Sequence, residues 1–161
     1  MVFRTLARLT GSNEDLEDMA QEAFLRLFRA LPHFRGDAQI TTFLYRIVVN
    51  VVNDEFRRRQ KTRLGSSVEE DFALELAHPS PNPAQIYERA QMQEAVDAAL
   101  QQLNPRDRVI LVLHYQEGRS YEEIAAILDA PMGTVKTHLF RARERLKSIM
   151  KEWTAACPAQ P

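Results

Sequence analysis

Cysteine, glycine and long hydrophobic runs are scarce in this chain of 161 residues. The one cysteine, Cys157, excludes a disulfide within the chain and fits a reducing compartment. Five glycines argue against a fold built from many tight turns. The most apolar run, FLYRIVVNVV, contains Arg46 and Asn50 and is too short to span a bilayer. The first residues turn polar too early for a signal peptide, so we expect a soluble, cytoplasmic protein without membrane insertion.

The chain also lacks an overall excess of positive charge, since its net charge is −1 and its pI is near 6.4. Residues 1–60 carry nine basic against eight acidic side chains, and residues 89–161 carry ten against nine. Residues 61–88 carry two against five, so most of the acidic excess lies in the middle. The bulk pI therefore leaves room for local basic faces, which are what a nucleic acid meets.

Two helices are predicted in the first third of the chain. Residues 14–31 place apolar side chains at helical spacing, with Ser12 or Asn13 expected to cap the start and Pro32 to end the helix. Residues 40–59 contain a β-branched run that could form a strand. The segment is too long for a typical strand, and its apolar residues fit one helical face, so we predict a helix.

The middle of the chain is predicted to be a linker between two small helical domains. Its segments GSSVEEDF and HPSPNPAQ are rich in Ser, Pro and acidic residues and show no periodicity. The expected all-α organisation is a first domain at 1–60, a flexible linker at 61–84, a second domain at 85–152 and a tail at 153–161. The second domain should contain four helices, at residues 84–103, 105–117, 120–128 and 134–153.

The last two helices have the features of a helix-turn-helix unit. Ser120 and Glu123 have the spacing of a capping box, Thr134 is expected to cap the final helix, and the turn DAPMG contains a glycine. In the final helix one apolar stripe should pack inward. It consists of Val135, Leu139, Ala142, Leu146 and Ile149.

Basic side chains lie off that stripe, which is typical of a helix that binds DNA. Lys136, Thr137 and Phe140 occupy the first turns, where such a helix meets base edges in the major groove. The residues expected to contact phosphates are Arg141, Arg143 and Arg145. A basic amphipathic helix can also be merely a solvated face, and a single histidine such as His138 is weak evidence by itself.

The first domain mixes aromatic rings, asparagine and arginine in the segment TTFLYRIVVNVVNDEFRRR. Rings can stack on unpaired bases, amides can read base edges, and arginine can follow the phosphate backbone. The alternative for Phe43 and Tyr45 is ordinary core packing. The alternative for Arg57 and the two arginines after it is the basic end of a helix.

Two long segments of the chain, one in each predicted domain, together resemble the extracytoplasmic-function (ECF, group IV) bacterial sigma factors. DLEDMAQEAFLRLFRALPHFRGDAQITTFLYRIVVNVVNDEFRRR is similar to region 2, and LQQLNPRDRVILVLHYQEGRSYEEIAAILDAPMGTVKTHLFRARERLK is similar to region 4. The resemblance covers about residues 3–60 and 89–150. It departs at Phe43, where many members have Trp, at His138, where Arg is frequent, and in a shortened first domain.

The resemblance implies partners and residue roles. It implies a sigma factor that binds core RNA polymerase through the β′ clamp and β flap, directs it to promoter DNA, helps to melt that DNA and is held by an anti-sigma factor. The polymerase-binding residues implied are Asp18, Gln21 and Glu22. Those implied for single-stranded DNA at the −10 element are Phe34, Arg35, Phe43, Tyr45, Arg46, Asn50, Asn53 and Arg57. Those implied for duplex DNA at the −35 element are Thr134, Lys136, Thr137, His138, Phe140, Arg141, Arg143 and Arg145.

Two other classes of function are weighed against this one. A stand-alone, LuxR-like regulator would bind duplex DNA without polymerase, but residues 1–60 show no βα alternation typical of a receiver domain. An enzyme is disfavoured because the acidic residues lie at a helix start, where the dipole favours them, and the histidines show no ligand spacing. We expect no catalytic residues, no metal and no cofactor.

Overall fold

The computed structural model describes residues 1–12, 15–36, 39–63 and 83–156. Within these ranges the chain is helical and contains no β-strand, as the predicted all-α class requires. Most elements are α-helices, η1 is a 3₁₀ turn, and η2 is a single π-helical turn. The elements are α1 (Val2–Thr10), α2 (Leu16–Ala30), η1 (Leu31–His33), α3 (Ile40–Arg63), α4 (Pro83–Gln102), α5 (Pro105–Leu111), η2 (Val112–Gln116), α6 (Tyr121–Leu128) and α7 (Met132–Ala156).

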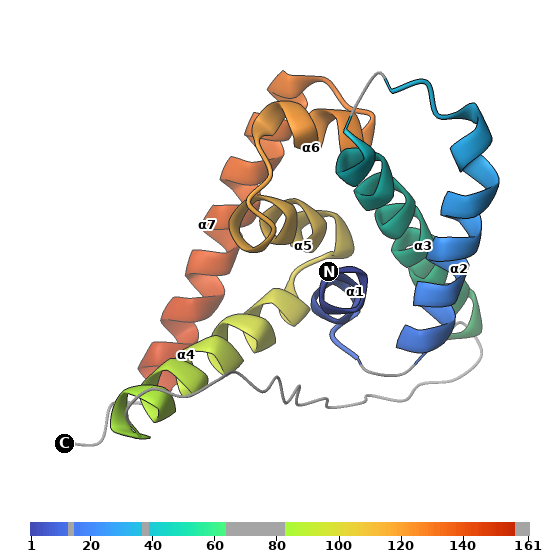
Figure 1. Cartoon of the computed structure of the whole chain (residues 1–161). Coiled ribbons are helices and arrows are strands. Elements are labelled where there is room, and N and C mark those ends of the chain that lie inside the picture. Colours follow the sequence, from blue (N-terminus) through green and yellow to red (C-terminus); the bar gives the residue numbers. More distant parts are fainter. Residues whose placement is uncertain (13–14, 37–38, 64–82, 157–161) are drawn as a thin grey trace.

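Helices α1, α2 and α3 form the first half of the molecule. Helices α2 and α3 lie side by side, and α1 packs against both (Figure 1). The predicted capping residue of α2 is wrong, because the N-cap is Asp15 in a left-handed conformation. Ser12 is instead buried, and its backbone N–H donates to Thr10 Oγ1 over 3.4 Å. The alternative cap, Asn13, lies outside the described residues.

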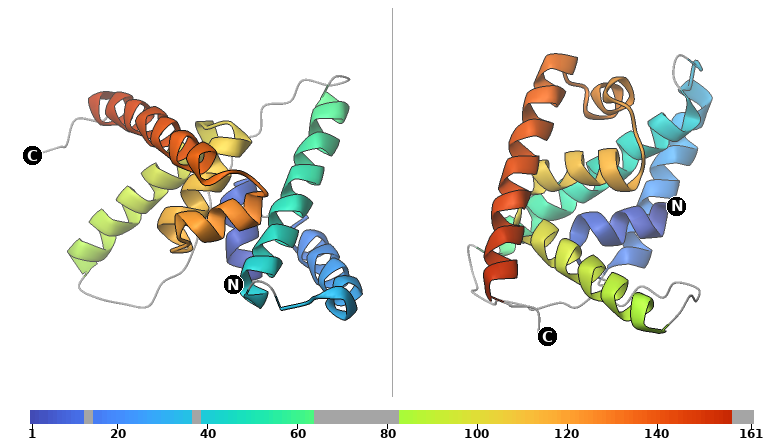
Figure 2. Two further views of the ribbon diagram at one scale, coloured as in Figure 1. Left: turned by 90° about the horizontal axis from the view of Figure 1, so that it is seen from above. Right: turned by 90° about the vertical axis from the view of Figure 1, so that its left-hand side faces the viewer.

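Helices α4 to α7 form the second half, in which the long α7 packs against α4, α5 and α6 (Figure 2). Asn104 caps α5 by accepting a hydrogen bond from the Asp107 N–H over 3.0 Å, and Pro105 is the first residue of that helix. The predicted cap of α7 is wrong. That helix begins at Met132, because the Pro131 carbonyl already accepts from the Val135 N–H, and Thr134 therefore lies inside it.

The predicted linker lies mostly outside the described residues. Helix α3 continues to Arg63 and α4 begins at Pro83, while residues 64–82 are not described. At the other end of the chain α7 extends to Ala156, and residues 157–161 are not described. The division into domains at 1–60 and 85–152 remains a prediction.

One hydrophobic core runs through both halves. Helix α3 packs against α6 and α5, and α1 packs against α5 and η2. In α3, Val48, Val49, Val51 and Val52 are all at most 4 % exposed. Consecutive positions on a helix point to different sides, so α3 must be covered on two sides. The first half supplies α1 and α2 on one side, and the second half supplies α5 and α6 on the other.

Candidate nucleic-acid interface

The helix-turn-helix unit consists of α6, the turn 129–131 and α7. Ser120 Oγ accepts from the Glu123 N–H over 3.2 Å, and the Glu123 carboxylate accepts from the Ser120 N–H over 2.8 Å, so the predicted capping box is present. Asp129 ends α6 in a left-handed conformation with φ of 50°. This turn places the start of α7 beside α6 with one face directed outward.

Apolar side chains hold α7 in place through the stripe that the sequence predicts. Val135, Leu139 and Ala142 are at most 4 % exposed, and Leu146 and Ile149 pack against the same core. The opposite face is solvent-exposed and mostly basic. It consists of Lys136, Thr137, Phe140, Arg141, Arg143 and Arg145, with Thr134 and His138 half-buried beside it.

Several basic residues of this face already contact other side chains of the protein. The Arg145 guanidinium forms an ion pair with Asp107, which itself accepts from Asn104 Nδ2 over 2.7 Å at the start of α5. Arg145 therefore ties α7 to α5. Lys136 Nζ lies 6.0 Å from the centre of the Tyr121 ring. A hydrogen bond with Tyr115 raises the pKa of Arg143, so that guanidinium stays charged.

The residues predicted to contact single-stranded DNA divide into two groups. Phe34 and Phe43 form a ring pair with centroids 5.2 Å apart, ahead of and at the start of α3, and Arg35 is exposed beside them. Arg46 and Asn50 are exposed on α3, and Arg46 pairs with Asp129 of the helix-turn-helix turn over 3.3 Å.

The second group, like Arg46, faces the other half of the chain. Tyr45 is 3 % exposed, and its hydroxyl donates to Glu117 Oε2 over 2.7 Å. Asn53 and Arg57 line a groove of about 360 Å³ together with Thr134 and His138 of α7. The groove therefore brings together side chains predicted to contact two different promoter elements.

The residues predicted to bind polymerase lie on α2. Asp18 and Gln21 are exposed, and Glu22 is half-buried. Glu22 accepts from Arg26 Nε over 2.7 Å, and Arg26 Nη1 donates to Asp54 of α3 over 2.8 Å. Hydrogen bonds to Asp54 and Glu22 raise the pKa of Arg26. Asp18 and Glu22 thus border a groove of about 390 Å³ between α2 and α3.

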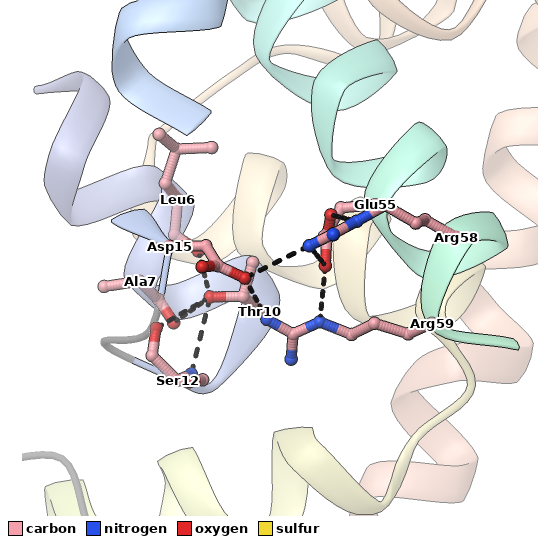
Figure 3. Close-up of polar contacts among 8 residues, drawn as sticks. All are labelled: Leu6, Ala7, Thr10, Ser12, Asp15, Glu55, Arg58 and Arg59. Atoms are coloured by element: carbon pink, nitrogen blue, oxygen red, sulfur yellow. Dashed lines mark hydrogen bonds and ion pairs between the residues drawn. The ribbon is translucent and has the colours of Figure 1, made fainter. Parts of the chain in front are cut away.

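A second ion-pair cluster fixes the start of α2 against the end of α3 (Figure 3). Arg58 Nη2 reaches Asp15 over 3.2 Å, and Arg59 Nη2 lies 3.7 Å from the same carboxylate. Both arginines also donate to Glu55, over 2.7 Å from each Nε, and these bonds lower the pKa of Glu55. Arg58 and Arg59, near the end of α3, therefore help to hold the start of α2 in position.

An exposed apolar patch on α2 and the start of η1 was not predicted from the sequence. Phe28 is 75 % exposed, and Phe24, Leu25 and Leu31 are each more than 40 % exposed. They line a shallow hollow together with Gln21, so the patch is continuous with the predicted polymerase-binding residues. The signal was available, because the apolar residues of 14–31 cover too wide an arc of the helix for a single buried face.

Metal binding and membrane insertion were the remaining possibilities for the described residues. Among them no group of three or more His, Cys, Asp or Glu side chains could hold a metal ion. None of the described helices is both long and apolar enough to cross a membrane.

Comparisons with known proteins match the two halves separately and in order. The family model described as "Sigma-70 region 2" matches residues 1–62, and the model described as "Sigma-70, region 4" matches residues 93–146. Two solved structures share the arrangement. The sigma factor RpoE in complex with the anti-sigma factor NepR from Bartonella quintana has a TM-score of 0.76 and 23 % identity, covering 93 % of this chain and 89 % of that chain. CnrH in complex with the cytosolic domain of CnrY has a TM-score of 0.64 and 25 % identity, covering 94 % and 81 %.

Curated relatives are similar along nearly the whole chain. The ECF RNA polymerase sigma factor SigE of Mycolicibacterium smegmatis is 37 % identical over 92 % of this chain, which spans 57 % of that relative's length. The RNA polymerase sigma-H factor of Pseudomonas aeruginosa is 35 % identical, covering 93 % of this chain and 80 % of the relative. The ECF RNA polymerase sigma-E factor of Escherichia coli is 36 % identical, covering 82 % and 72 %.

Proposed function

Because this chain belongs to the family of ECF RNA polymerase sigma factors, we propose that it binds core RNA polymerase, directs it to specific promoters and promotes DNA melting there. A sigma factor is a transcription initiation factor rather than a catalytic enzyme. The observation that carries the proposal is that one chain holds a region 2 match followed by a region 4 match. The proposed function places the protein in the cytoplasm with the polymerase.

We propose that α2 docks on the β′ clamp through acidic and apolar side chains together. Asp18, Gln21 and Glu22 supply polar complementarity to a basic partner surface. The neighbouring Phe28 and Leu25 supply apolar area that is exposed in this structure. Exposed apolar patches rimmed by polar residues mark protein–protein contacts, which supports this surface as the docking face. The second half would contact the β flap.

The DNA-contacting roles are assigned from exposure and charge. The start of α7 is proposed to enter the major groove at the −35 element, where Lys136, Thr137 and Phe140 are exposed. Arg141 and Arg143 would contact phosphates. At the −10 element, Phe34, Arg35 and Phe43 are proposed to receive unstacked bases, and Asn50 to read a base edge.

An anti-sigma factor is a further proposed partner. The support is that both solved structures named above are complexes, one with the anti-sigma factor NepR and one with the cytosolic domain of CnrY.

A binding measurement separates the proposed function from that of a stand-alone regulator. The purified chain and its Asp18→Lys variant would be titrated into core RNA polymerase and, separately, into duplex DNA. The proposal expects tight polymerase binding that Asp18→Lys abolishes while leaving the helical content unchanged. Duplex binding without polymerase binding would overturn it and favour the regulator.

A further inference from the structure

The groove of about 360 Å³ is lined by side chains of α3, α5, α6, α7 and the turn 129–131. The most buried of its apolar lining residues are at most 3 % exposed, namely Val49, Val109, Ile110 and Val135. Phe56, Leu128 and Ala130 are half-buried and add to the apolar lining. Pockets of about 300 to 1,000 Å³ with an apolar lining and a few polar groups are typical of small-molecule sites. The groove therefore has the size and the lining of a site for a small ligand.

The charged side chains at this groove are basic. Arg57 and Arg106 are exposed, and no Asp or Glu is among the described residues that line the groove. Within the described part of the chain, the Arg106 side chain forms no hydrogen bond or ion pair. Arg57 Nη1 approaches Asp54 over 3.4 Å, but both side chains are well exposed, so this pair is weak. The groove therefore presents positive charge beside its apolar lining.

The volume and the lining distinguish between possible occupants. One turn of an α-helix with its side chains, about 10 Å across and 5.4 Å high, occupies roughly 420 Å³. That volume exceeds the groove, so a helix of a partner protein does not fit inside it. A nucleotide base stacks best on a free aromatic face. Here the buried lining is aliphatic, and the Arg108 guanidinium already lies 5.7 Å from the centre of the Phe56 ring. The lining is complementary to an anion with an aliphatic body.

We propose that this groove binds a small amphipathic anion, a carboxylate with an aliphatic chain of medium length. The chain contacts Val109 and Val135 at the apolar lining. The carboxylate accepts hydrogen bonds from the Arg106 guanidinium, and Arg57 is a second cationic neighbour. Arginine binds carboxylates through paired, charge-assisted hydrogen bonds, which are stronger than those between neutral groups. The apolar lining supplies affinity, and the arginines select for the anion.

The consequence of ligand binding rests on the proposed function. Several lining residues are also predicted DNA contacts, namely Asn53, Arg57, Thr134 and His138. A bound carboxylate occupies the space beside them and offsets the charge of Arg57, so it competes with promoter DNA for these side chains. Ligand binding itself requires neither polymerase nor DNA, because every group in the proposed site belongs to this chain.

The test uses octanoate as the probe and the full, isotope-labelled chain. Nuclear magnetic resonance shifts of backbone amides locate the probe, and their titration gives the dissociation constant. Octanoate should shift the amides of Val109, Ile110 and Val135. Hexanoate has two CH₂ groups fewer and should bind about fifteenfold more weakly, since each buried CH₂ contributes about fourfold. Octan-1-ol has a similar chain without the charge and should bind roughly tenfold more weakly than octanoate.

Two variants examine the charged and the apolar part of the site separately. Arg106→Gln should weaken octanoate binding by about tenfold and leave octan-1-ol binding unchanged. Arg29→Gln, at an exposed position on α2 outside the groove, is the matched control and should bind octanoate as the wild type does. Ala130→Leu adds carbon atoms to the lining and should weaken the binding of both probes. Circular dichroism would establish that each variant keeps its helices.

Two results would overturn the proposed site. One is the absence of amide shifts in the groove at millimolar octanoate, including the case in which shifts are confined to the exposed patch around Phe28. The other is octan-1-ol binding as tightly as octanoate, with Arg106→Gln unchanged. A chain that binds octanoate as expected but fails to bind polymerase would support the site and contradict only the proposed function, so the two failures are distinguishable.

Discussion

Arg108 Nη1 of α5 donates a hydrogen bond to the Leu9 carbonyl oxygen, 2.9 Å away at the end of α1. The same guanidinium donates to the carbonyl oxygens of Leu100 over 2.9 Å and Gln101 over 2.7 Å, near the end of α4. Carbonyl groups at helix ends lack partners within the helix. One side chain, 6 % exposed, therefore satisfies the ends of helices from both halves. Burial lowers the pKa of Arg108 to about 10.

Replacing Arg108 with lysine should lower the free energy of unfolding by roughly 3 kcal/mol, because a single ammonium cannot reproduce the several bonds of the planar fork. Urea denaturation of the variant measures this loss. Arg106→Lys, two residues away at an exposed position, is the control and should change stability by no more than about 0.5 kcal/mol. Equal stability of Arg108→Lys and wild type would contradict the capping role.

The ionisation of Tyr45 should be visible at high pH. Its pKa is raised to about 12 in the folded chain, from an ordinary value of 10.0, first by burial and then by the bond to Glu117. Its contribution to stability is therefore complete below about pH 10 and is lost as the pH rises through about 12, since the unfolded chain releases the proton first. Phenolate absorbance should show an ionisation near pH 12 that Tyr45→Phe lacks, and unchanged titration curves would refute the assignment.

The apolar patch on α2 should contribute to polymerase binding without contributing to stability. Phe28→Ser removes a ring that is 75 % exposed, so we expect unfolding free energy to change little. Affinity for core polymerase should fall by roughly tenfold or more if the ring is buried in the complex. Met92→Ser, at a 56 % exposed position on α4, provides the comparison. If the two variants bind polymerase equally well, the patch is not part of the docking face.

The basic residues of α7 should have two different roles: some recognise the DNA sequence and others contact phosphates. Lys136→Ala should weaken use of the preferred −35 sequence more than that of altered sequences. Arg141→Ala should weaken all sequences similarly and reduce the salt dependence of binding by about one phosphate contact. Transcription from promoter variants at several salt concentrations measures both effects. Lys147→Ala, which removes an exposed basic residue further along the same helix, is the control. If it weakens promoter use as much as Lys136→Ala does, the effect of Lys136 comes from its charge and not from sequence recognition.

Local signals in the sequence predicted most of the helices and the helix-turn-helix unit. The capping box of Ser120 and Glu123 and the stripe from Val135 to Ile149 depend on neighbours within four residues, and both are present. The starts of α2 and α7 were misplaced. Helix α2 starts later than expected, because Asp15 is its N-cap and the Asp15 carbonyl accepts its first hydrogen bond. Helix α7 starts earlier than expected, because the Pro131 carbonyl already accepts from the Val135 N–H. Such ends depend on backbone geometry that residue type alone does not determine.

Contacts between the halves could not be predicted from the sequence. Tyr45 and Glu117 are separated by 72 positions, and neither residue type indicates the pairing. The same holds for Arg108, which looks like one more basic residue in a helix but is buried against α1. The change in charge and periodicity at residue 60 predicted two helical domains joined by a linker, but it carried no information on the packing of α3 against α6.

Opening of promoter DNA is the most direct measurement of the proposed sigma-factor function. Core RNA polymerase would be mixed with the purified chain and a randomised DNA library, and the DNA that becomes reactive to a probe of unpaired thymine would be sequenced. We predict one shared pair of −35 and −10 elements, opened only when the chain is present and lost with Asp18→Lys. Opened DNA without a shared sequence, or no opening despite polymerase binding, would contradict it.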